Sequence, residues 1–275
     1  MAEFEDNFPD WRKQVESTTF YSGGTGDIGG GQFTVLTRPG IDYVVKIPKK
    51  DPRWLEGYTL VEGQAPELAI PFLRVQDLAL NIDRIKKRIP EVIVQQKVPV
   101  VHESLEDSFR KGDVDQILHL IHGTAQSDIE LFKKGVFIPD PDFGNYGIDR
   151  DGTVKCLDLG SARNDVGGDE TYSGLCFVRA RSHYRSFFEL KYLEQTFKLS
   201  DLSFSTIYAQ EVGITPRDTN LENLLDPRTP SFNSALAIST ARIGHDEFVQ
   251  RAPKGAPYEL NEEVIRHLPA YFGLN

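Results

Sequence analysis

Four polar features of the chain have the chemistry needed to hold phosphate groups and a divalent metal ion. They are the glycine-rich run Gly24-Thr25-Gly26-Asp27-Ile28-Gly29, the lysine Lys46, the pair Asp140 and Asn145, and the aspartate Asp158. Glycines let backbone amides approach phosphate oxygens, and a lysine neutralises their charge. Carboxylate and amide oxygens are ligands that suit Mg²⁺. Together these residue types predict a site that grips a nucleotide triphosphate and its metal ion, with Asp140 and Lys46 as the catalytic residues.

The glycine-rich run fits three structural contexts: a flap over phosphates, a dinucleotide-binding loop and a flexible linker. A dinucleotide-binding loop opens a helix. Here the run is followed by residues 32–36, whose polar and apolar side chains alternate and so predict a strand, and then by a second strand at 43–47. This context favours the flap, with Gly24, Gly26 and Gly29 in contact with the nucleotide.

Hydrophobic periodicity predicts the elements that position the other residues. The expected elements are helices over 54–69, 114–132 and 182–199, strands over 70–75 and 92–96, a partly helical basic connection over 81–88, and a hairpin of 146–148 with 154–157. The hairpin would carry Asn145 at its start and Asp158 at its end. Two oxygen ligands on a short hairpin suit Mg²⁺, which completes its coordination with water and phosphate.

Composition narrows the class of protein. The chain has 275 residues, a formal net charge of −10 and 39% hydrophobic residues, as expected of a globular protein. The acidic balance argues against non-specific nucleic-acid binding, and no apolar run is long enough to cross a membrane. Cys156 and Cys176 are too few for a disulfide framework. We expect no nucleic-acid or membrane partner and a cytoplasmic location, and an effector exported by a dedicated bacterial system would have the same composition.

The order and spacing of the four features resemble those of the protein-kinase-like superfamily, from about Ser22 to Arg163. The resemblance implies an α+β, two-lobed protein-kinase-like fold, with a β-rich N-lobe over residues 1–98 and a mostly helical C-lobe over residues 99–275. It also implies ATP and Mg²⁺ as cofactors. The expected reaction is transfer of the γ-phosphate of ATP to a hydroxyl, foremost a Ser or Thr of a protein.

The resemblance assigns roles on the catalytic side of the site. Asp140 would orient the acceptor hydroxyl, as the aspartate of the kinase catalytic loop does. Asn145 and Asp158 would bind Mg²⁺, with Asp158-Leu159-Gly160 standing where kinases have D-F-G.

Further roles concern the nucleotide itself. Lys46 would bind the α- and β-phosphates, and its acidic partner is expected at Glu62, with Glu67, Glu56 or no pair as alternatives. The adenine is expected to contact the backbone between Gln96 and Val98. Val44 is expected to form one apolar wall of the adenine site.

The chain also departs from the protein-kinase pattern. Ile138-Pro139-Asp140 stands where protein kinases have H-R-D, Asp142 occupies a position that is often basic, and no A-P-E follows Asp158. These differences resemble the atypical and small-molecule branches of the superfamily. They leave open a small-molecule phosphotransferase of the aminoglycoside or choline kinase type, a nucleotide-binding pseudokinase scaffold, and transfer of AMP in place of phosphate.

Overall fold

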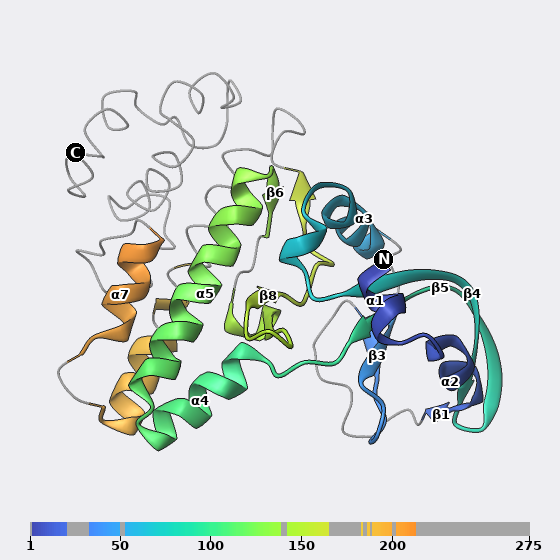
Figure 1. Ribbon diagram of the computed structural model, residues 1–275, viewed down its shortest axis with the longest axis horizontal. Coiled ribbons are helices and arrows are strands. Elements are labelled where there is room, and N and C mark those ends of the chain that lie inside the picture. The colour runs from blue at the N-terminus through green and yellow to red at the C-terminus, as the bar shows by residue number, and fades with distance from the viewer. Residues whose placement is uncertain are drawn as a thin grey trace.

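The computed structural model describes residues 2–20, 33–49, 53–138, 142–164, 183, 186–187, 189–199 and 202–212, and it has a mixed α+β architecture. Figure 1 shows a twisted sheet with short helices at one side of the molecule and longer helices at the other. Gly24, Gly26, Gly29 and Asp140 lie outside the described residues, so the roles expected for them stay predictions.

The sheet has five strands in the order β1-β4-β5-β3-β2. These are β1 (Thr19–Phe20), β2 (Phe33–Leu36), β3 (Tyr43–Pro48), β4 (Phe72–Ile82) and β5 (Ile85–Gln96). β1 pairs with β4 in parallel, and the other neighbours are antiparallel. The strands predicted over 32–36 and 43–47 are therefore confirmed within the described residues, which begin at Phe33 in the first of them.

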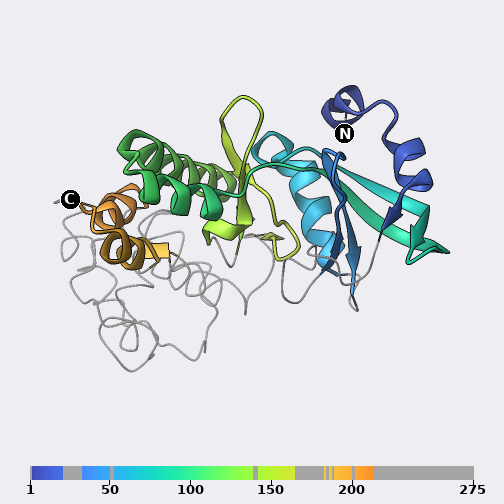
Figure 2. The same cartoon turned by 90° about the horizontal axis from the view of Figure 1, so that it is seen from below.

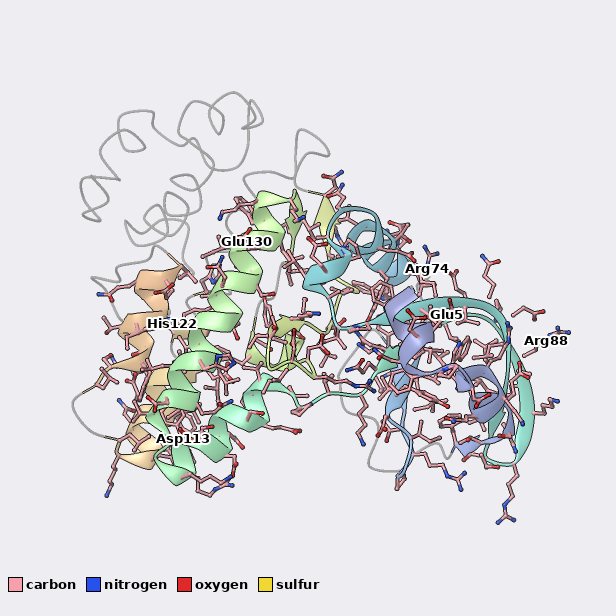
Figure 3. All side chains as sticks on the ribbon, viewed as in Figure 1. Glu5, Arg74, Arg88, Asp113, His122 and Glu130 are labelled. Atoms are coloured by element: carbon pink, nitrogen blue, oxygen red, sulfur yellow. The ribbon has the colours of Figure 1, made fainter. Side chains whose placement is uncertain are left out.

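The partly helical connection predicted over 81–88 is wrong, because β4 and β5 form one long antiparallel hairpin. Asp83 and Arg84 both have positive φ, as the two central residues of a tight hairpin turn require. On β4 the buried side chains of Leu78, Leu80 and Ile82 alternate with more exposed ones, which is the period of a strand. Figure 3 shows Arg88 pointing outward from the far end of this hairpin.

Two short helices, α1 (Ala2–Asn7) and α2 (Trp11–Ser17), pack on the sheet (Figure 2). Their buried apolar side chains form one core cluster with those of β3, β4 and β5; the helical contributors are Phe4, Trp11 and Val15. We call this the outer core.

Helix α3 (Trp54–Gln64) and the 3₁₀ turn η1 (Pro66–Leu68) follow β3. The helix predicted over 54–69 is confirmed in type but ends earlier. Proline lacks a backbone donor and restricts the residue before it to extended conformations, which stops α3 ahead of Pro66. The buried side chains of α3 are Leu55, Tyr58 and Val61, spaced by three residues along one helix face.

The remaining helices are α4 (Val101–Lys111), α5 (Val114–Lys133) and α7 (Phe204–Glu211), and residues 189–197 are also helical. The long helix predicted over 114–132 is confirmed by α5. Gly112 at φ +68° turns the chain between α4 and α5, and the side chain of Asp113 caps α5 by accepting from the Gln116 amide. No helix among the residues that the structure describes is long and apolar enough to span a membrane.

Short strands complete the described chain. They are β6 (Val136–Phe137), which pairs with β9 (Arg163–Asn164), and the hairpin of β7 (Tyr146–Ile148) and β8 (Val154–Cys156), preceded by the 3₁₀ turn η2 (Phe143–Asn145). The predicted hairpin is confirmed. It packs on α5, where His119 Nε2 lies 2.9 Å from the Gly152 carbonyl oxygen. A Cβ on Gly123 would lie 2.7 Å from Val154, so the glycine permits this close approach.

Candidate nucleotide and metal site

A pocket of about 590 Å³ lies between the sheet and the segments that precede and follow the β7–β8 hairpin. Its walls come from β2, β3, the end of β5, the start of α4, η2 and the residues after β8. Six residues named from the sequence line it: Val44, Lys46, Gln96, Val98, Asn145 and Asp158. Glu62 is not among the lining residues. The fold thus gathers residues that are more than 100 positions apart in the chain.

Lys46 projects from β3 into this pocket and is only 7% exposed. Its Nζ donates hydrogen bonds to the Tyr58 hydroxyl at 2.9 Å and to the Leu157 carbonyl at 3.0 Å. Burial lowers the pKa of Lys46 below its usual value, because the charged ammonium loses its hydration, and the negative charge of Asp158 opposes this shift. Lys46 is therefore a buried amine that faces a cavity.

The ion pair expected between Lys46 and Glu62 is absent, since the described residues that receive hydrogen bonds from Lys46 are Tyr58 and Leu157. The phase of α3 explains the difference. Tyr58 lies on the buried face of the helix, whereas Glu62, one turn further on, is half-buried at its flank. The alternative candidate Glu67 pairs with Lys134 at 2.6 Å.

Tyr58 is a site residue that the sequence reasoning missed. An available signal was its position one helical turn before Glu62, on the same face as Leu55 and Val61. A tyrosine hydroxyl is not the partner that the resemblance implies for this lysine.

Asn145 and Asp158 are brought together by the backbone of the hairpin that separates them. The Asn145 carbonyl accepts from the Leu157 amide at 2.7 Å and from the Asp158 amide at 3.2 Å. The Asp158 carboxylate accepts from the Gly160 amide at 3.1 Å, and Asp142 caps η2 by accepting from the Gly144 amide at 2.8 Å. These bonds fix the backbone of Asn145 and Asp158, the two expected metal ligands, on the same side of the pocket.

The far end of the pocket is tied to the same hairpin. Gln96 is buried and its Nε2 donates to Asp149 Oδ1 at 3.2 Å, while Lys155 pairs with the other Asp149 oxygen at 2.7 Å. Val98 contacts the hairpin closely, because a Cβ on Gly147 would lie 2.5 Å from its side chain. The segment expected to hold the adenine therefore rests on the strands that position Asn145 and Asp158.

Cys156 lies behind the site on β8 and is fully buried. Burial raises the pKa of its thiol, and the nearby carboxylate of Asp158 adds to the effect. The thiol is therefore kept protonated and unreactive, and we treat Cys156 as a core residue.

The donor set fits Mg²⁺ bound together with a nucleotide. No group of three or more His, Cys, Asp or Glu residues able to hold a metal ion occurs in the described segments. Asn145 and Asp158 instead offer two oxygen donors beside an open cavity. Mg²⁺ suits such a site, since it keeps several waters and binds through one or two carboxylates plus substrate phosphates.

No protein-family model matches the chain, and no curated protein matches it. Among solved structures, the chain is similar to a divergent kinase lacking the glycine-rich loop that regulates membrane ultrastructure of the Toxoplasma parasitophorous vacuole. That match has 13% identity and a TM-score of 0.39, and it covers 73% of each chain. A second match is the bifunctional kinase-methyltransferase WbdD, with 15% identity and a TM-score of 0.37, covering 73% of this chain and 48% of that one.

Proposed function

We propose that the protein is an ATP- and Mg²⁺-dependent phosphotransferase that moves the γ-phosphate to a hydroxyl, foremost a Ser or Thr of a protein. One observation carries the proposal: a buried lysine and two oxygen ligands, from segments far apart in the chain, meet on one pocket. A lysine, an amide and a carboxylate in this arrangement are what phosphoryl transfer requires, because catalysis there is mostly positioning and charge stabilisation.

Each of the expected site residues has a defined role in this reaction. The Lys46 ammonium binds the non-transferred phosphates, and its position at the sheet holds the triphosphate in one orientation. Asn145 and Asp158 hold the metal ion, which when bound supplies neutralisation of the phosphate charge. Asp140 orients the acceptor hydroxyl, and the glycine-rich run covers the phosphates.

The pocket size is consistent with a nucleotide. A cavity of about 590 Å³ falls within the range of about 300–1,000 Å³ that is typical of small-molecule sites. Its sheet side carries the apolar residues Phe33, Val35 and Val44, which suit the face of a purine, and its hairpin side carries the polar ones.

The test uses ATP labelled at the γ or α phosphorus, incubated with the protein alone and with a cell lysate. Transfer of γ-label to protein, dependent on Mg²⁺, is the expected result. Label only on small molecules would replace the protein acceptor with a small-molecule one, and transfer from the α position would indicate AMP transfer. ATP binding without transfer would leave a nucleotide-binding scaffold, and absence of ATP binding would overturn the proposal.

A further inference from the structure

The partner of the pocket lysine is a tyrosine that is fully buried. Tyr58 has no exposed surface, and its hydroxyl accepts the hydrogen bond from Lys46 Nζ at 2.9 Å. Its ring is held between Phe33 and Phe72, edge to face, with centroid distances of 5.7 and 5.1 Å. A ring packed on two sides keeps its hydroxyl in one place, so the ammonium has a fixed anchor.

The ammonium that Tyr58 anchors also reaches the segment that carries the expected metal ligand. Lys46 Nζ donates a second hydrogen bond to the Leu157 carbonyl, directly before Asp158, at 3.0 Å. Beside this contact, Gly57 touches Leu159 so closely that a Cβ there would lie 2.0 Å from the Leu159 carbonyl oxygen. Helix α3 is thus bound to the Asp158 segment by adjacent backbone and side-chain contacts.

The groups that accept hydrogen bonds from Lys46 are uncharged, unlike the carboxylate of an ion pair. Within the described residues no Asp or Glu forms an ion pair with Lys46, and its two acceptors there are a neutral hydroxyl and a carbonyl. A carboxylate beside the ammonium would compete with phosphate for its charge. Neutral acceptors orient the ammonium and leave its charge available to an anion in the pocket.

We propose that Tyr58 is the residue that positions Lys46, in place of an acidic partner, and that α3, which packs on Leu159 through Gly57, couples the phosphate-binding lysine to the metal-binding segment. The inference rests on the proposed function, because it specifies how the nucleotide site is held together. It makes α3 a fixed part of that site.

The main test compares two conservative variants. Tyr58→Phe removes the positioning hydroxyl and keeps the ring. Tyr43→Phe is the matched control, since Tyr43 is equally buried on β3, and its hydroxyl bonds to the Trp11 carbonyl and to Gln14 on the opposite side of the sheet. We expect Tyr58→Phe to weaken Mg²⁺–ATP binding about tenfold, the range of one hydrogen bond to a charged group, while adenosine binding stays unchanged. Tyr43→Phe should leave both affinities unchanged.

A double-mutant cycle separates positioning from general structural damage. In a Lys46→Met background, Tyr58→Phe should cause no further loss of ATP affinity, because its effect acts through the ammonium. Full additivity of the two substitutions, or an equal loss of ATP and adenosine affinity in Tyr58→Phe, would overturn the inference.

A readout without nucleotide keeps the inference distinct from the proposed function. Lys46 should acetylate several-fold faster with acetic anhydride in Tyr58→Phe than in the wild type or in Tyr43→Phe, as followed by peptide mass spectrometry. If the wild type binds no ATP but this difference appears, the proposed function fails and the Tyr58–Lys46 linkage stands. If Lys46 reactivity is the same in all three proteins, the linkage fails.

A second variant covers the case in which Tyr58→Phe does not fold. A 3-fluorotyrosine at position 58 keeps both ring and hydroxyl, and its fluorine resonance reports the hydrogen bonds of that hydroxyl. Lys46→Met should shift the resonance, whereas Lys87→Met, at an exposed lysine of the β4–β5 hairpin, should not. A resonance that ignores Lys46→Met would overturn the inference.

Discussion

The two sides of strand β3 show how one short sequence serves two purposes. Tyr43 and Val45 face the outer core under α1 and α2, whereas Val44 and Lys46 face the pocket. Both sides hold a buried tyrosine. The hydroxyl of Tyr43 binds the Trp11 carbonyl and Gln14, and the hydroxyl of Tyr58, on the pocket side, binds the ammonium of Lys46.

The two sides of β3 differ in what the burial of their side chains achieves. The outer core joins apolar side chains, and its tyrosine hydroxyl satisfies neighbouring polar groups, which stabilises the fold. The pocket side buries a charged amine, which costs stability and keeps a cation ready for a ligand. We therefore expect changes on the outer side to alter stability alone, and changes on the pocket side to alter ligand binding or the coupling between α3 and the hairpin.

The largest effect is expected from Asp158→Ala. Loss of this carboxylate removes one of the two expected metal ligands, so Mg²⁺-dependent turnover of ATP should fall by about 10²- to 10³-fold or more. Circular dichroism and the urea midpoint should stay close to those of the wild type. The control is Asp151→Ala, which removes an exposed carboxylate from the turn of the same hairpin and should leave turnover intact. Unchanged turnover in Asp158→Ala would contradict the assignment of the site.

Gly57→Ala and Gly63→Ala make a matched pair within α3. A Cβ at Gly57 would meet the Leu159 carbonyl oxygen at 2.0 Å, and this backbone atom has little room to yield, so the free energy of unfolding should fall by about 1–3 kcal/mol. At Gly63 no atom lies within 4 Å of the added Cβ. Alanine there should raise the free energy of unfolding by about 0.5–1 kcal/mol through helix propensity. Urea denaturation measures both. Equal responses would mean that α3 is not packed against the Asp158 segment as described.

Two groups on opposite sides of β3, Lys46 and Tyr43, should contribute to stability in alkali with opposite signs. Burial lowers the pKa of Lys46, so between that pKa and the usual lysine value the unfolded chain binds more protons, and stability should rise with pH. Burial raises the pKa of Tyr43 from 10.0 to about 12, so its contribution to stability is present below 10.0 and is lost as pH rises through about 12. Urea midpoints measured against pH should lose the rise in Lys46→Met, and their fall should become smaller in Tyr43→Phe, where Tyr58, whose pKa is also raised by burial, still contributes.

ATP affinity gives the ligand-binding counterpart of the lysine titration. Because phosphate binding needs the ammonium, affinity should fall as pH rises through the lowered pKa of Lys46, before exposed lysines lose their charge. Lys46→Met should bind ATP weakly and with no such decline. A wild-type affinity that stays constant until the exposed lysines titrate would show that the ammonium does not contact the nucleotide.

The smallest effect is expected from Tyr43→Phe. Removing its hydroxyl should lower the free energy of unfolding by about 1 kcal/mol, the usual contribution of one hydrogen bond, and should leave ATP binding unchanged. Isothermal calorimetry and urea denaturation measure the two quantities. A loss of ATP affinity in this variant would show that the two sides of the sheet are not independent.

Local periodicity was enough to predict β2, β3, α5 and the β7–β8 hairpin, because each has a clear apolar repeat or turn signal within its own residues. It failed at 81–88, where four basic residues obscured the strand period and only Ile82 is buried. Packing under α2 determines the secondary structure of that segment. A local sequence pattern does not contain this information.

The candidate site shows the same division. A common site for Lys46, Asn145 and Asp158 was expected from the resemblance that their order and spacing carry, and all three line one pocket. The partner of Lys46 did not follow, because the rotation of α3 about its axis is set by Gly57 against Leu159 and by aromatic packing around Tyr58. The choice between Tyr58 and Glu62, one helical turn apart, depends on where α3 lies along its axis as well as on that rotation.

The burial of Cys156 makes its thiol a reporter of how often this part of the protein opens. Its sulfur sits on β8, directly behind the residues that hold Asp158, and its protonated, solvent-free state blocks alkylation while the hairpin is closed. In a Cys176→Ser background, the rate of iodoacetamide modification therefore counts how often this part of the molecule opens. Any compound that occupies the neighbouring cavity and holds the strands together will lengthen the interval between those openings.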